Sequence, residues 1–175
     1  LLVGGDFTRV NGEPHVGTVV INPSTGQIDP SWDLQIVNAL RGGAVSVRAL
    51  TYYDGNVYMG GAFTHLSGGG SSRVYARNAG RVSLSGRPDR SWNPEISGSV
   101  QAVGVSEANS AFYAGGHFTT AHGNQRAWYA AKFSTQPGAA VDTGFNFEPS
   151  SATAGKYQQT IATAGNRVYI GGSEH

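Results

Sequence analysis

Apolar and polar residues alternate loosely along most of this chain, which is the pattern of half-buried β-strands, and no stretch holds the 3.6-residue apolar period of an α-helix. The pattern is clearest in four segments, where it predicts strands at residues 47–53, 57–64, 73–84 and 91–94. Turns are expected between them because Asp, Asn and Gly, which tolerate positive φ, fill the gaps. We therefore predict an all-β fold of short antiparallel strands, with no helix longer than a turn.

A glycine doublet ends an alternating apolar run at four places, which lie about 55 residues apart. The doublets are Gly4-Gly5, Gly60-Gly61, Gly115-Gly116 and Gly171-Gly172. The first three are followed by a variable residue, a phenylalanine and a threonine. These phenylalanines are Phe7, Phe63 and Phe118.

A second motif recurs once after each of the first three doublets. It places an aspartate shortly before a large aromatic residue: Asp29 and Trp32, Asp89 and Trp92, and Asp142 and Phe145. Loops of variable length between fixed units are typical of repeat arrays. We therefore interpret residues 1–175 as a single array of units that start near residues 1, 57, 111 and 168.

Adjacent glycines inside a strand indicate a β-bulge or the close approach of another backbone. Both conditions arise near the axis of a β-propeller, where blades converge and side chains must be small. The aromatic residues of the two motifs are then expected to fill the wider space between neighbouring blades. The array therefore predicts propeller blades of four antiparallel strands, about three complete and one partial.

The paired motifs resemble the delta-60 repeat family of β-propellers, and kelch-type blades carry a similar doublet. The resemblance covers essentially the whole chain. It implies a bacterial protein that is secreted or exposed at the cell surface, in a class without an established activity, and it supplies no catalytic residues. Two places depart from the family pattern: Ser173-Glu174-His175 replaces x-Phe-Thr, and Gly144 stands where Ser31 and Ser91 occur in the other units.

Propellers typically close with 4–8 blades, so the units present here are expected to form an incomplete ring. We expect the chain to be a fragment of a larger propeller, completed by other blades of the same protein or by additional protein chains. An open stack of repeats is the alternative. In each case the terminal units are expected to expose unpaired strand edges and apolar faces.

The composition of the chain argues against some classes of binding partner. Charged residues make up 13% of the chain and the formal net charge is +1, which gives no long-range field to attract nucleic acid or an anionic membrane. No apolar run approaches the roughly 18 residues of a membrane span, and any targeting signal is expected upstream of residue 1. Cysteine is absent, which excludes disulfides, Cys-ligated zinc and thiol nucleophiles. We expect neither nucleic-acid binding nor membrane insertion.

The aspartates of the second motif are the candidate metal ligands. Asp29, Asp89 and Asp142 are each followed by a second oxygen-bearing residue, namely Asp33, Asn93 and Asn146. Such oxygens bind Ca²⁺, but a calcium loop needs six or more of them, and the same residue types cap turns. We prefer the turn role and expect no other cofactor. His117 and His122 are weaker metal candidates.

The position after each doublet is a candidate for an active site, since it holds chemically different residues: Asp6, Ala62, His117 and Ser173. Such variation is expected in an axial channel that carries a site, and equally from neutral drift. No Gly-x-Ser-x-Gly nucleophile elbow occurs. The triple glycine at residues 68–70 is not a phosphate loop, because no Lys-Ser/Thr follows and no helix is predicted.

Exposed aromatic rings are the preferred ligand contacts, because they stack on sugars or anchor a protein partner. The candidates are Tyr52, Tyr53, Trp128 and Tyr129. The leading hypothesis is a non-enzymatic propeller module that is a scaffold for protein or glycan binding. The alternatives are a hydrolase or lyase with an axial-channel site, and a structural repeat of a surface appendage or particle.

Overall fold

The computed structural model describes residues 1–123, 125–145, 147 and 157–173. Strands account for 51% of the structure, and the described residues contain no α-helix. The helical element among them is the 3₁₀ turn η1 (Glu107–Asn109), which is three residues long. The prediction of an all-β fold is confirmed.

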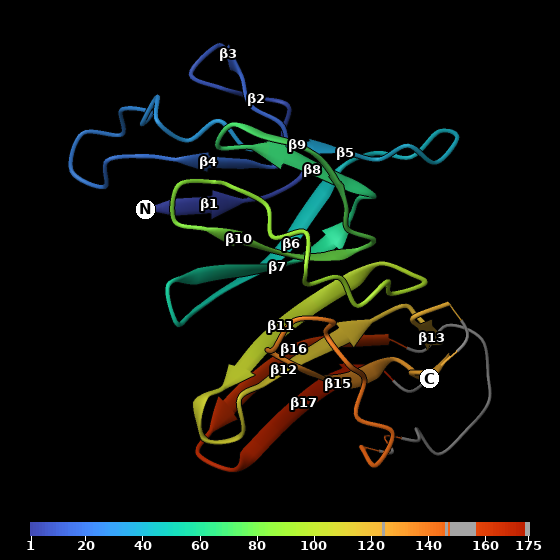
Figure 1. The fold of residues 1–175 in the computed structure, drawn as a ribbon. Helices are drawn as coiled ribbons and strands as arrows, with labels where there is room; N and C mark the ends of the chain where they lie inside the picture. The colour runs from blue at the N-terminus through green and yellow to red at the C-terminus, as the bar shows by residue number, and fades with distance from the viewer. Residues whose placement is uncertain (124, 146, 148–156, 174–175) are drawn as a thin grey trace.

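Four main sheets follow one another along the chain, and every pairing within them is antiparallel (Figure 1). Sheet 1 contains β1 (Leu2–Gly4) and β4 (Thr18–Val20). Sheet 2 contains β6 (Ser46–Tyr53), β7 (Asn56–Ala62) and β10 (Ala79–Ser83). Sheet 3 contains β11 (Val100–Ser106), β12 (Ala111–Gly116) and β15 (Ala130–Ser134). Sheet 4 contains β16 (Tyr157–Ala164) and β17 (Arg167–Ser173).

A small hairpin leaves each of the first three sheets after the Phe-Thr pair, and we call these the side hairpins. The first consists of β2 (Arg9–Val10) and β3 (Glu13–Pro14). The second consists of β8 (His65–Gly68) and β9 (Ser71–Tyr75), and β5 (Gln35–Val37) adds a third strand to it. The third consists of β13 (Thr120–Ala121) and β14 (Gln125–Arg126).

The side hairpins correct the predicted third strand, residues 73–84, which is two strands in two different sheets. β9 pairs with β8, whereas β10 pairs with β7. The break occurs at Asn78, which adopts a φ of 61° and accepts a hydrogen bond on its carbonyl from the Gly61 amide at 3.0 Å. Gly17 and Tyr129 have positive φ and accept the same bond in their units, so the break recurs.

The predicted fourth strand, residues 91–94, is wrong. The chain makes one isolated bridge, between Pro88 and Val82 of β10, and then turns at Asp89. Proline lacks the amide needed to continue a ladder, and the aspartate side chain offers its own hydrogen bonds to the backbone. The described residues thus form sheets of two or three strands, and they do not form a closed ring.

The main sheets stack face to face. β1 packs on β6, β11 packs on β6 and β7, and β16 packs on β11 and β12. One buried apolar cluster lies between sheets 1 and 2 and contains Val47 and Met59, and another lies between sheets 2 and 3 and contains Tyr58 and Phe112. Met59 and Tyr58 are adjacent in β7 and point to opposite faces, so β7 contributes to both clusters.

The first glycine of each of the first three doublets faces the next sheet. A Cβ added to Gly60 would lie 2.4 Å from Cγ1 of Val100 and 2.7 Å from Cγ1 of Val103, both in β11. The same relation joins Gly4 to Val47, at 2.9 Å, and Gly115 to Gln158, at 3.0 Å. Glycine at this position therefore sets how closely successive sheets approach.

The second glycine of the last three doublets faces its own sheet at a β-bulge. A Cβ on Gly61 would lie 1.9 Å from the carbonyl oxygen of Ser46, and the register of β6 shifts beside it, between Val47 and Ala49. Gly116 and Gly172 occupy the same position beside register shifts in β11 and β16. Both reasons for a glycine doublet, a bulge and a close approach, thus occur at one place in successive sheets.

Aromatic residues fill the space between sheets away from the doublets. Trp92 is fully buried and packs edge-on against Tyr58 and Phe112, with ring centroids 5.0 Å apart in both pairs. Its Nε1 donates to the Ser134 carbonyl in β15 at 2.9 Å, which joins the turn after sheet 2 to sheet 3. The equivalent residues of the other units, Trp32 and Phe145, are buried or half-buried, and so are the phenylalanines that follow the doublets, Phe7, Phe63 and Phe118.

Candidate binding clefts

The recurring aspartates form side-chain turns. Oδ1 of Asp89 accepts hydrogen bonds from the backbone amide of Ser91, at 2.8 Å, and from its hydroxyl, at 2.7 Å. Asp29 makes the same pair of contacts with Ser31. In the third unit Asp142 accepts from the Gly144 amide at 2.9 Å, and glycine supplies no hydroxyl. Each aspartate thus holds the chain in the bend that brings the following aromatic residue inward.

Two of these aspartates also hold a cation with their second oxygen. Oδ2 of Asp89 accepts from Nε of Arg81 at 2.9 Å, and Oδ2 of Asp142 accepts from Nζ of Lys132 at 2.8 Å. Burial raises the pKa of Asp89, but the hydrogen bonds from Ser91 and Arg81 together lower it by more. The pKa of Asp89 therefore lies below the ordinary value. The Lys132 hydrogen bond is the main reason that the pKa of Asp142 is also lowered.

These contacts favour the turn role over the calcium alternative. Oδ1 of Asp33 accepts from the Gly69 amide at 2.7 Å, and Oδ1 of Asn93 accepts from the Glu95 amide at 3.1 Å. Asn146 lies outside the described residues. Within the described ranges no three His, Asp or Glu side chains form a group that could hold a metal ion.

The two histidines predicted as weaker metal candidates have separate contacts. The His117 ring stacks on Tyr157, with centroids 4.5 Å apart. His122 has a φ of 46°, and its Nε2 lies 2.8 Å from the Ala139 carbonyl oxygen. The two rings are therefore held by different parts of the fold. His175 lies outside the described residues.

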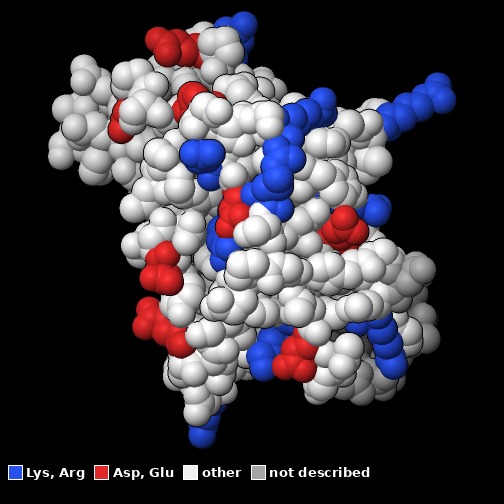
Figure 2. Space-filling model, viewed as in Figure 1, with Lys and Arg blue, Asp and Glu red and all other residues white. Residues whose placement is uncertain are grey.

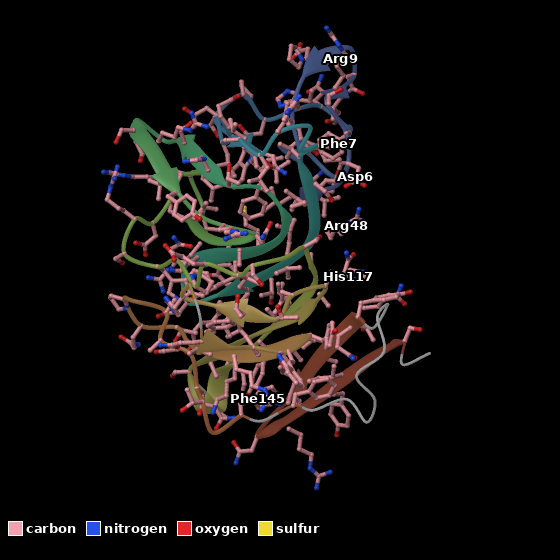
Figure 3. The ribbon with its side chains drawn as sticks, turned by 90° about the vertical axis from the view of Figure 1, so that its right-hand side faces the viewer. Asp6, Phe7, Arg9, Arg48, His117 and Phe145 are labelled. Atoms are coloured by element: carbon pink, nitrogen blue, oxygen red, sulfur yellow. The ribbon has the colours of Figure 1, made fainter. Side chains whose placement is uncertain are left out.

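A row of residues that are polar, except for Ala62, follows one side of the stack. It combines the positions after the doublets with the bulge residues of the opposite strands; its described members are Asp6, Ala62, His117, Ser173, Arg48, Gln101 and Gln159. Figure 3 shows Asp6, Arg48 and His117 following one another along this side. Asp6 is the one carboxylate among these seven residues, and its Oδ2 lies 3.4 Å from Nη2 of Arg48.

The predicted aromatic contacts do not form one patch. Tyr52 is 62% exposed and pairs with Val57 at the hairpin end of β6, where Tyr53 is half-buried against the core. Trp128 is 40% exposed and precedes β15 at the doublet end of sheet 3. Tyr129, beside it, is the half-buried residue at the recurring break with positive φ. Trp128 alone among the four lines one of the clefts described next.

Three open clefts occur at equivalent places, each between a side hairpin and the aspartate turn of the same unit. The first has a volume of about 680 Å³ and is lined by Glu13 and His15 of the hairpin side and by Trp32. The second, about 730 Å³, is lined by serines of β9 and by arginines of the turn. The third, about 410 Å³, is lined by Trp128 and Phe145. Sequence reasoning did not find these clefts, since their two walls come from separate motifs.

Trp128 is the most exposed ring of the third cleft. The guanidinium of Arg126 lies 3.9 Å from its ring centre, so a cation–π contact holds one face of the indole. Phe145 also lines the cleft and packs edge-on against Tyr113 with centroids 5.6 Å apart. Gln125, Asp142 and Thr143 add polar groups to the rim.

No protein-family model, no curated protein sequence and no solved structure matches the chain. In the described ranges the structure has no helix of the length and apolarity that crossing a bilayer requires.

Proposed function

We propose that this chain is a run of β-propeller blades from a secreted or cell-surface protein, and that it is a non-enzymatic module that binds a glycan. The stacking of sheets 1 to 4 supports the propeller, because each of the first three doublets contacts the next sheet at the same position. The family resemblance in the repeats supports the location. Other blades, or additional chains, would cover the outer face of sheet 4, where Tyr169 of β17 is 54% exposed.

The observation that carries the binding proposal is the recurrence of the three clefts. Their frame is shared, since each lies between a side hairpin and an aspartate turn, but their linings differ in chemistry. A fixed scaffold with variable surface residues is how repeat and loop-bearing proteins present binding sites. A merely structural repeat has no need of such clefts.

The third cleft favours a sugar ligand. A partly exposed indole stacks on the apolar face of a pyranose, and nearby amide, hydroxyl and carboxylate groups bond to its hydroxyls. Trp128 supplies the ring, and Gln125, Thr143 and Asp142 supply the polar groups. The Arg126 contact fixes the ring before the ligand arrives, which reduces the entropy cost of binding.

The polar row gives less support to the catalytic alternative. Glycoside hydrolysis generally uses two carboxylates, one of them free to donate a proton. The row contributes Asp6, which is paired with Arg48. We therefore assign the row to the support of adjacent sheets rather than to catalysis.

The test is binding of the purified chain to an array of neutral oligosaccharides, followed by titration of the best binder. Trp128→Ala is expected to weaken binding roughly tenfold, since a lost ring stack costs about 1 kcal/mol or more. Tyr52→Ala is the matched control, because Tyr52 is exposed at the other end of its sheet and is outside the clefts. Absence of any neutral ligand, or equal binding by the Trp128 variant, would overturn the proposal.

A further inference from the structure

The second cleft, between the β8–β9 side hairpin and the turn after β10, brings together cationic and hydroxyl groups from distant parts of the sequence. Arg87 and Arg90 come from the turn, and Ser71 and Ser72 begin β9. All four side chains line the same volume of about 730 Å³. Arg87 and Arg90 are exposed, so their guanidinium groups are accessible from solvent.

Glycine permits this closeness. Gly69 has a φ of 56°, and a Cβ on it would lie 2.7 Å from Cβ of Arg87. The triple glycine at residues 68–70 therefore allows the tip of the side hairpin to lie against the turn. Nη2 of Arg90 donates to Oγ of Ser72 at 2.8 Å across the cleft, which leaves its other donors available.

The cleft carries an excess of positive charge. Asp89 also lines it, but its two oxygens are held by Ser91 and Arg81. In the described part of the chain, the ion pairs found involve neither Arg87 nor Arg90. Figure 2 shows basic side chains gathered in a stripe on this face, over the region of β8 and β9, with an acidic group inside it.

We propose that the second cleft binds an anionic glycan through sulfate or carboxylate groups, an inference that rests on the proposed function of the clefts. Guanidinium groups recognise both oxyanions with paired hydrogen bonds. The hydroxyls of Ser71 and Ser72 and the amide of Asn56 are suited to sugar hydroxyls. A net charge of +1 provides none of the long-range attraction on which nucleic-acid binding depends, so the local cleft favours a glycan.

The experiment compares four polymers by titration at low and physiological salt: dextran sulfate, polygalacturonate, unmodified dextran and single-stranded DNA. The first two separate sulfate from carboxylate recognition, and dextran shows binding that needs no charge. The double variant Arg87→Gln/Arg90→Gln is compared with Arg41→Gln, which removes an exposed arginine outside the clefts. All three substitutions are at exposed side chains, and near-ultraviolet circular dichroism verifies folding.

We expect dextran sulfate or polygalacturonate to bind and dextran not to bind. The double variant should lose about tenfold or more in affinity, whereas Arg41→Gln should change it by less than about twofold. The inference is overturned if neither anionic polymer binds, if Arg41→Gln causes an equal loss, or if DNA binds as tightly with the same arginine dependence. Neutral-glycan binding at Trp128 would then still uphold the proposed function, so the two failures are distinguishable.

Discussion

The second glycine of the last three doublets lies where its own sheet leaves no room for a side chain. Gly61→Ala would place a methyl group within 1.9 Å of the Ser46 carbonyl oxygen, and backbone on both sides would have to move. We predict a loss of about 3 kcal/mol in the free energy of unfolding, measured by urea denaturation. A variant as stable as the parent would contradict the close approach.

At Gly144, in contrast to Gly61, we predict that an added side chain stabilises the protein. Ser31 and Ser91 occupy this place in the first two units and donate hydroxyl hydrogen bonds to the aspartate, both at 2.7 Å. A Cβ on Gly144 would meet only Oδ1 of Asp142, at 3.2 Å. Gly144→Ser should therefore stabilise the chain by about 0.5–1 kcal/mol in the same denaturation assay. A loss of stability would show that the third turn differs from the others.

The aspartate turn of the second unit is an element whose stability depends on pH. The pKa of Asp89 is lowered in the folded chain, so near the ordinary carboxyl pKa of about 3.9 the folded chain binds fewer protons than the unfolded chain. The stabilisation is complete above that value and is lost as pH falls through the lower folded pKa. Asp29 and Asp142 have lowered pKa values as well and act in the same direction.

Replacing Asp89 tests that turn. The Arg81 side chain is 10% exposed and would lose its counter-charge in Asp89→Asn, although Tyr58 still accepts its hydrogen bond at 3.1 Å. We predict a loss of about 2 kcal/mol at pH 7, less than for a fully buried pair because the carboxylate is partly exposed. The loss should shrink below about pH 4. Asp54→Asn, in an exposed hairpin turn, is the control and should have little effect; equal losses at pH 7 and pH 3 would contradict the ion pair.

At the level of strands, the sequence predicts what local residues decide. The hairpin at Asp54-Gly55 lies where it is expected, because both residues supply positive φ. The break at Asn78 was missed, since an apolar pattern continues through it and its contacts come from distant residues. The Gly61 amide donates to its carbonyl, and its Nδ2 donates to the Ile96 carbonyl. The fourth strand was wrong because hydrogen bonds to the Asp89 side chain replace the ladder.

The clefts, too, depend on contacts between residues that are distant in the sequence. An exposed Trp128 could be proposed from the sequence, because an aromatic residue at an unpaired position indicates a contact surface. Nothing local indicates that Arg87 and Arg90 lie beside Ser71 and Ser72, since the two segments meet only when the side hairpin folds back. A comparison of the units could have suggested this cleft, because the second unit combines arginines in its aspartate turn with small residues in its side hairpin.

At the scale of the molecule, the doublets and the aromatic residues act together. The doublets bring sheets into close contact along one edge, and Trp92, Tyr58 and Phe112 keep sheets 2 and 3 packed elsewhere. Arg81 of β10 adds a polar link between these sheets, because it donates to the Thr135 carbonyl. This combination supports the proposal that the stacked sheets are propeller blades.

The central claim is that each of the first three doublets touches the next sheet, and nuclear Overhauser effects test it most directly. The account predicts contacts from the Gly60 Hα protons to the methyl groups of Val100 and Val103, from Gly4 to Val47, and from Gly115 to Ile161. The pairing of Gly61 with Val47 provides an internal reference within one sheet. Detection of that reference without the contacts between sheets would contradict the stacked arrangement.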